Sequence, residues 1–134
     1  MRKMSILLAA SLAALSASAP AAAPDREAEL ERALHGRVAG EPVHCIDMHR
    51  VRGSTIIPGT AVIYDAGSIL YVNRPDSGAD SLDRWDMLVT RLYTSQLCNT
   101  DTVDLIEQGS HAYSGILFLG DFVPYRRVQT SDVR

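Results

Sequence analysis

Lysine is nearly absent from this chain of 134 residues, and no run of arginines takes its place. The only lysine is Lys3, and the 13 Lys and Arg residues face 16 Asp and Glu residues, which gives a formal net charge of −3. Proteins that bind nucleic acid carry a basic patch that neutralises phosphates. We therefore expect no nucleic-acid partner.

Long apolar runs are also missing, except at the start. "ILLAASLAAL", residues 6–15, follows two basic residues and precedes a stretch of small residues. This run is too short to span a bilayer, and its surroundings are typical of a secretory signal peptide. We predict a signal peptide at residues 1–21, a periplasmic or secreted protein, and no membrane span after signal cleavage.

Cysteine is scarce, because the chain has only Cys45 and Cys98. In an exported protein, a small and even number of cysteines indicates a disulfide. The bond would close a loop of about 53 residues and would stabilise the fold by about 4 kcal/mol in the chain-entropy estimate. We predict that the two cysteines are bonded to each other.

The common catalytic signatures are absent: there is no G-x-S-x-G, no Gly-rich phosphate loop and no C-x-x-C. The exception is "EPVHCIDMHRVR", residues 41–52, which gathers His44, Cys45, Asp47 and His49. In an extended strand, Cys45, Asp47 and His49 share one face and could bind a metal ion. A thiol or hydrolase enzyme using Cys45 with His44 or His49 is a second alternative. A disulfide removes the thiolate that both need, so we expect no cofactor and no enzymatic activity.

One helix is expected near the amino terminus, in "PDREAELERALHG", residues 24–36. Asp25 can cap its first turn, and Gly36 can end it in the left-handed conformation. Leu30 and Leu34 form only a narrow apolar stripe, so we expect the helix to lie on the surface of the domain rather than in its core. Residues 22–40 are therefore interpreted as a helical lead-in.

Short apolar runs separated by turn residues follow this lead-in. We expect strands at residues 43–46, 54–57, 61–65, 69–73, 87–93, 102–108, 112–120 and 122–128. Pro58-Gly59 and Gly67 predict hairpin turns, and the regular spacing favours an antiparallel meander. Pro124 cannot donate to a ladder, so the last strand is expected at a sheet edge. The fold class is therefore all-β, with seven or eight strands in a single domain at residues 41–128, forming a small barrel or a sandwich. Residues 129–134 are expected to be a flexible tail.

Several short motifs resemble a family of small exported bacterial proteins with no assigned function. They are "CIDMHRVRGSTII", "GTAVIYDAG", "LYVNRP", "SQLC" and "LGDFVPYRR", and together they span most of residues 40–127. The resemblance implies an exported all-β domain. It implies no activity, cofactor or catalytic residue.

Polar and aromatic side chains at strand ends and in the loop at residues 74–86 suggest where the protein could bind a partner. Arg52, Arg74 and Trp85 form the candidate recognition surface, because Arg and Trp are enriched at interfaces. The alternative is that the arginines form salt bridges and turn caps with Asp47, Asp65 and Asp101. A pocket for an acidic small ligand at one barrel mouth is also considered.

Without a catalytic constellation, the sequence is interpreted as a non-enzymatic periplasmic domain. Its expected partner is a protein or a component of the cell envelope.

Overall fold

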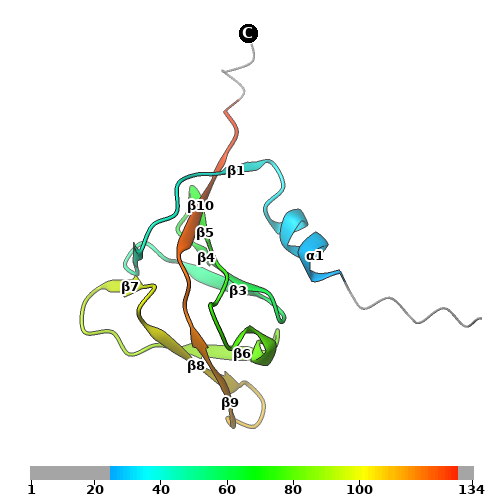
Figure 1. Ribbon diagram of the computed structural model, residues 1–134, viewed down its shortest axis with the longest axis vertical. Coiled ribbons are helices and arrows are strands. Elements are labelled where there is room, and N and C mark those ends of the chain that lie inside the picture. The colour runs from blue at the N-terminus through cyan, green and yellow to red at the C-terminus, as the bar shows by residue number, and fades with distance from the viewer. Residues whose placement is uncertain (1–24, 130–134) are drawn as a thin grey trace, which may run out of the picture.

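The computed structural model describes residues 25–129 (Figure 1). The predicted signal peptide lies outside the described residues, as does the tail beyond residue 129. The elements are α1 (Arg26–Ala33), β1 (Arg37–Ala39), β2 (Cys45–Asp47), β3 (Gly53–Ile57), β4 (Ala61–Asp65), β5 (Ile69–Asn73), the 3₁₀ turn η1 (Ala79–Ser81), β6 (Asp86–Val89), β7 (Gln96–Cys98), β8 (Thr102–Glu107), β9 (Tyr113–Phe118) and β10 (Phe122–Arg127). No helix among residues 25–129 has the length and apolar character needed to cross a membrane.

The strands form three antiparallel sheets. Their orders are β1-β10-β5-β4-β3, β2-β7 and β6-β8-β9. The fold is thus mostly β, but it does not close into a barrel, because within the described residues β3 and β6 each end a sheet without pairing with each other. The structure has two more strands than the largest number expected from the sequence. These are β1 and β7, each three residues long, which is too short for a period-two pattern to show.

Two hairpin turns lie where the sequence places them. Thr60 N donates to Ile57 O across Pro58-Gly59 at 3.0 Å, and Gly59 has a φ of 65°. Ala66 N donates to Ile69 O at 2.9 Å around Gly67, whose φ is 82°. Only glycine adopts this left-handed conformation without strain, which explains its place in both turns.

The expectation that the last strand lies at an edge is wrong. β10 pairs with β5 on one side and with β1 on the other. Pro124 is tolerated because of a break in the ladder on the β1 side. Its carbonyl accepts from Gly40 N, just beyond the end of β1, and the backbone nitrogen of a strand residue faces the same neighbour as its carbonyl. The missing donor of Pro124 therefore faces this break rather than β5.

Helix α1 lies on the surface of the domain, as expected, since Leu30 is its one buried residue, but it packs against a core cluster. Asp25 caps it by accepting from Ala28 N at 3.1 Å. Leu30 and Leu34 are only 2% and 8% exposed. They join Ile57, Ala61, Ile63 and Val72 in one core cluster on one face of the five-stranded sheet. The lead-in is thus continuous with the β domain, and β1 enters the sheet before residue 41.

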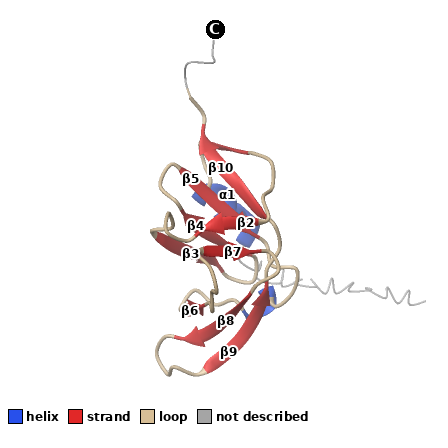
Figure 2. Ribbon diagram, turned by 90° about the vertical axis from the view of Figure 1, so that its left-hand side faces the viewer, coloured by secondary structure: helices blue, strands red, loops and turns tan. Residues whose placement is uncertain are grey.

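The opposite face of the five-stranded sheet covers the second and larger core cluster. Its members are Ile46, Ile56, Val62, Tyr64, Leu82, Leu97, Val103, Leu105, Leu117, Leu119 and Phe122. They come from all three sheets, so this cluster joins them into one domain. Figure 2 shows β6, β8 and β9 grouped at the end of the molecule opposite to the carboxyl end of β10.

Candidate functional site

The histidine-rich stretch at residues 41–52 begins with a short strand that carries a disulfide. β2 pairs with β7, and Cys45 lies directly opposite Cys98. The two cysteines are bonded, with a Cα–Cα distance of 4.0 Å. Asn99 N donates to His44 O, so the Cys45–Cys98 pair is one of the closer, non-hydrogen-bonded pairs of the ladder. The predicted disulfide is confirmed, and the bridged Cys45 supplies no thiolate.

The other three candidate residues of this stretch, His44, Asp47 and His49, do not converge on one point. After Asp47 the chain curls into a turn, in which Asp47 Oδ1 accepts from His49 N at 3.0 Å. His44 instead lies 3.1 Å, from Nδ1 to Oδ1, from the carboxylate of Asp121. Among residues 25–129 no group of three or more His, Cys, Asp and Glu side chains is placed to hold a metal ion.

His44 takes part in a small polar cluster at the surface. Asp121 Oδ1 accepts from Asn99 Nδ2 at 2.6 Å and lies next to the His44 ring. The hydrogen bond with His44 lowers the pKa of the Asp121 carboxyl, and the bond from Asn99 lowers it further. The cluster joins the end of β7 to the start of β10. It contains a base and a carboxylate but no nucleophilic side chain.

Half of the arginines among residues 25–129 take part in ion pairs. Arg50 pairs with Asp47 at 3.8 Å, and Arg52 with Asp65 at 3.5 Å. Both salt bridges are among those that the structural alternative predicts, but the side chains of both arginines stay largely exposed. Asp101 caps a turn, since its carboxylate accepts from Cys98 N at 2.8 Å.

The structure does not bring the candidate recognition surface together. Arg74 follows β5 next to the β4 residue Val62 and makes a bidentate pair with Glu27 at 2.8 Å. Arg52 lies at the opposite end of β4, beside Asp65. Trp85 is 66% exposed and directly precedes β6. Of the three, only Trp85 borders the surface described next.

One face of the three-stranded sheet lies outside the core, and most of its side chains are apolar. Met87 pairs with Ile106, which pairs with Tyr113, so these side chains form one row. Ile116 and Phe118 continue along β9, and Val89 along β6. On β8 between them, the same face carries two polar residues: Asp104 pairs with Val89 and Ile116, and Thr102 pairs with Phe118. We call Met87, Val89, Ile106, Tyr113, Ile116 and Phe118 the outer face.

The outer face has no partner among the described residues. Val89, Tyr113 and Phe118 are 42%, 62% and 49% exposed. Met87, Ile106 and Ile116 are partly buried but pack against neither core cluster. The alternating residues Leu88, Val103, Leu105 and Leu117 point inward and contact the larger cluster. β6 and β9 therefore carry apolar residues on both faces, a pattern typical of strands that are covered on both sides. β8 does so only at Ile106, because Thr102 and Asp104 are the other residues of its outward side.

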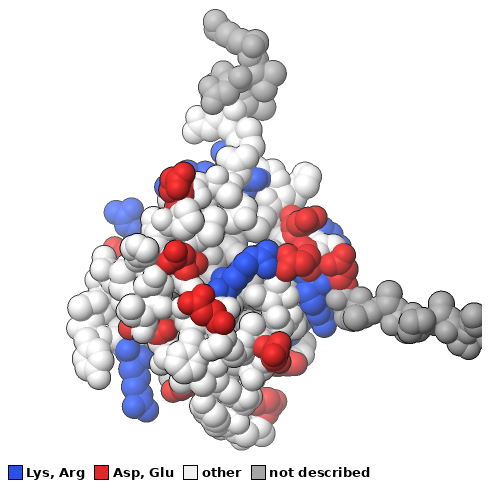
Figure 3. Space-filling model, in the orientation of Figure 1, with Lys and Arg blue, Asp and Glu red and all other residues white. Residues whose placement is uncertain are grey.

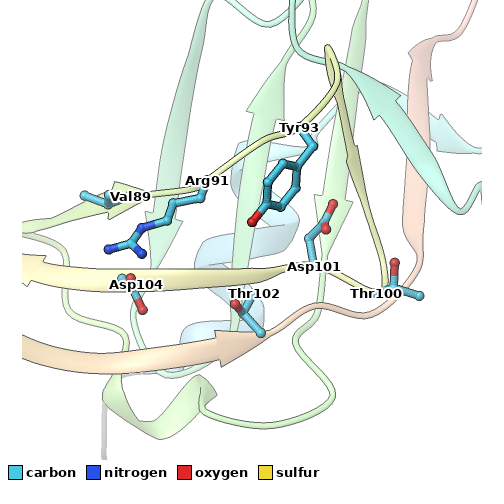
Figure 4. A pocket seen from close by; sticks show the side chains of 7 residues that line it. All are labelled: Val89, Arg91, Tyr93, Thr100, Asp101, Thr102 and Asp104. Carbon is cyan, nitrogen blue, oxygen red and sulfur yellow. The ribbon is translucent and has the colours of Figure 1, made fainter.

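A polar hollow of about 350 Å³ adjoins the outer face along β8. It is lined by Val89, Arg91, Tyr93, Thr100, Asp101, Thr102 and Asp104. Figure 4 shows the Arg91 guanidinium and the Asp104 carboxylate near each other over β8, with the Tyr93 ring standing above Asp101 and Thr102. No ion pair joins Arg91 to Asp104 within the described residues. The hollow offers both charge signs beside an apolar surface.

Charged side chains elsewhere are mixed in sign. Figure 3 shows acidic and basic side chains close together beside α1. There Arg74 pairs with Glu27, and Arg84 with Glu29 at 2.6 Å. The visible face shows no large field of one sign.

The chain was compared with family models, curated proteins and solved structures, and nothing matched. The outer face and the polar hollow are therefore the features that bear on function. The sequence does indicate this site, because "MLV", "LIE" and "ILF" place apolar residues on both faces of their strands. Such runs predict two covered faces, but they do not show which face is left without cover.

Proposed function

We propose that this protein is a non-enzymatic, exported binding domain that docks a protein of the cell envelope on its outer face. The observation that carries the proposal is the apolar outer face of β6, β8 and β9, which nothing among residues 25–129 covers. Exposed apolar patches of this kind mark interaction sites on monomeric proteins. The adjoining polar hollow provides hydrogen-bonding groups of the sort found at an interface rim.

Export is part of the same proposal. The Cys45–Cys98 disulfide supports it, because such bonds persist in oxidising compartments and are rare in the cytosol. The apolar run near the amino terminus and the resemblance to small exported bacterial proteins point the same way. We propose a periplasmic or secreted location after removal of residues 1–21.

A protein fits this surface better than the other classes considered. The outer face is an exposed sheet surface, which suits the broad contact of a protein interface. Pockets for small acidic ligands are concave and lined by convergent cations, whereas the hollow holds Arg91 beside two aspartates. The thiol enzyme and the metal site both depend on a free Cys45, which is bonded.

Site-specific photo-crosslinking tests the proposal. A benzoyl-phenylalanine replaces Tyr113 or Phe118 in the exported protein, one substitution at a time, and the adducts formed in intact cells are identified by mass spectrometry. The matched control places the same group at Val38, which is 56% exposed on β1, outside the outer face.

We expect Tyr113 and Phe118 to give one common protein adduct and Val38 to give none. The adduct should disappear when Ile116→Glu is added, because this substitution places a second carboxylate next to Asp104 and removes an apolar side chain from the middle of the outer face. Adducts of equal yield at Val38, or none at the outer face, would contradict the proposal.

A further inference from the structure

A second concave site lies between β3 and β6, which are edge strands of two different sheets. It is lined by Met48, Val51, Arg52, Gly53, Ser54, Tyr64, Leu88 and Thr90, and its volume is about 250 Å³. We call it the β3–β6 cleft, because β3 and β6 supply its two sides. It shares no residue with the outer face or the polar hollow. Its volume far exceeds the roughly 30 Å³ that one water molecule occupies in the liquid.

Both sides of the cleft are unpaired strand edges. β3 ends the five-stranded sheet, and β6 ends the three-stranded sheet. The second edge of each strand has no ladder partner among residues 25–129. A free edge presents backbone N–H and C=O groups in a row, which is a template for another strand. A Cβ at Gly53 would meet no atom within 4 Å, so the space over the face of β3 is open at its start.

The wall of the cleft holds a buried polar group without a partner. Tyr64 is only 3% exposed, and its hydroxyl has no hydrogen-bond partner. Burial raises the pKa of this phenol, so at neutral pH the hydroxyl is protonated and is available as a donor. A buried hydroxyl without an acceptor lowers stability, and such groups are rare in folded proteins. The hydroxyl oxygen is itself buried, so a ligand that displaces the side chains over it would supply the missing acceptor oxygen.

The remaining lining groups indicate the chemistry of the ligand. Met48, Val51 and Leu88 are apolar side chains that pack partly against the larger core cluster. Arg52 stands at the rim, 69% exposed at its side chain and 3.5 Å from Asp65. An apolar group thus fits inside the cleft, and a carboxylate fits at its rim.

We propose that the β3–β6 cleft binds an extended peptide segment of a partner protein, which adds to the free edge of β3. One apolar side chain of the peptide enters the cleft, and an acidic side chain next to it pairs with Arg52. An oxygen of the peptide accepts from the Tyr64 hydroxyl. Strand addition to a free sheet edge is a recurring mode of peptide recognition, in which backbone bonds give affinity and pockets give specificity.

The probes for the test are blocked hexapeptides made of alternating Thr and Val. The central pair is Leu-Glu in the first peptide, Leu-Lys in the second and Ala-Glu in the third. Binding to the full-length exported protein is followed by titration and by hydrogen exchange of the β3 and β6 amides. Ser54→Trp fills the cleft, since Ser54 lies opposite Tyr64 on β4. Thr55→Trp is the matched control, because successive strand residues point to opposite faces.

The Leu-Glu peptide should bind at least tenfold more tightly than the other two and should slow exchange at β3. Ser54→Trp should abolish this binding, and Thr55→Trp should leave it unchanged. Failure of all three peptides to bind at 1 mM would overturn the proposal, and so would equal binding to the Ser54→Trp variant.

Tyr64→Phe supplies an independent readout. Without its unpartnered hydroxyl the protein should melt about 4 °C higher or more, while the Leu-Glu peptide should bind at least tenfold more weakly. A lower melting temperature would show that the hydroxyl serves the fold, and this would overturn its assignment to a ligand.

Discussion

The individual polar residues that the sequence suggests as catalytic or metal-binding mostly have structural roles. Cys45 is bonded to Cys98, and Asp47 holds the turn that follows β2. Asn73 is fully buried, where it donates to Gly120 O at 2.7 Å and accepts from Gly120 N at 3.1 Å. The disulfide could be predicted from composition and export. The Asn73–Gly120 contact could not, because it joins residues 47 positions apart.

Removal of the disulfide should lower stability substantially. Cys45→Ala combined with Cys98→Ala is expected to cost about 2–5 kcal/mol in the free energy of unfolding, because the unfolded chain regains the freedom of a long loop. Urea denaturation measures this cost. His49→Ala is the control and should change stability by no more than about 0.5 kcal/mol, since His49 is exposed. A loss in His49→Ala as large as in the cysteine variant would show a structural role for His49.

The carboxyl of Asp121 should titrate below the usual range for aspartate. Its pKa is lowered first by the hydrogen bond with His44 and then by the bond from Asn99. A folded-state pKa below the unfolded value adds stability above the unfolded pKa. That stability is lost as the pH falls through the folded pKa.

Carboxyl NMR titrations of variants separate the two causes. His44→Ala should raise the pKa of Asp121 more than Asn99→Ala does. The pKa of Asp65, which the backbone N–H of Gly67 lowers, should stay unchanged in both. An Asp121 titration that is identical in the wild type and in both variants would exclude the cluster as its cause.

At the scale of elements, the hairpins of β3, β4 and β5 follow from local turn chemistry, and the sequence predicts them. The placement of β10 and α1 does not follow, because it depends on contacts between distant segments. Pro124 indicates an edge strand, yet β10 lies between β1 and β5. The proline is accommodated because β1 ends beside it. The two leucines of α1 give a weak stripe, yet they complete a core cluster with side chains from three strands. The apolar pattern of the sequence therefore underestimates how strongly the helix packs against the five-stranded sheet.

Helix α1 should be held mainly by apolar burial rather than by its ion pairs. Leu30→Ala removes a side chain that is 2% exposed and should cost about 2–5 kcal/mol. Arg74→Ala breaks the pair with Glu27, whose members are 54% and 59% exposed, and should cost no more than about 1 kcal/mol. Thermal denaturation compares the two. A larger loss for Arg74→Ala would contradict this order of contributions.

At the scale of the whole molecule, one domain holds three small sheets around a shared core and leaves one sheet face uncovered. The sequence predicts the all-β class and the bond between β2 and β7. It does not predict the outer face, because a strand with apolar residues on both sides reads as fully buried. The outer face can be identified only from the strand register, which places Met87, Ile106 and Tyr113 in one row. This row is the basis for proposing a binding domain.

Oxidative footprinting of the outer face tests the central claim most directly. Hydroxyl radicals modify exposed Met, Tyr, Phe and His side chains, and the modification of each residue is compared between intact cells and the purified protein. If a partner covers the outer face, Met87, Tyr113 and Phe118 should react several-fold more slowly in cells. His49, which is exposed and does not belong to the outer face, should react at the same rate in both. Equal rates for the three outer-face residues in cells and in the purified protein would contradict the account.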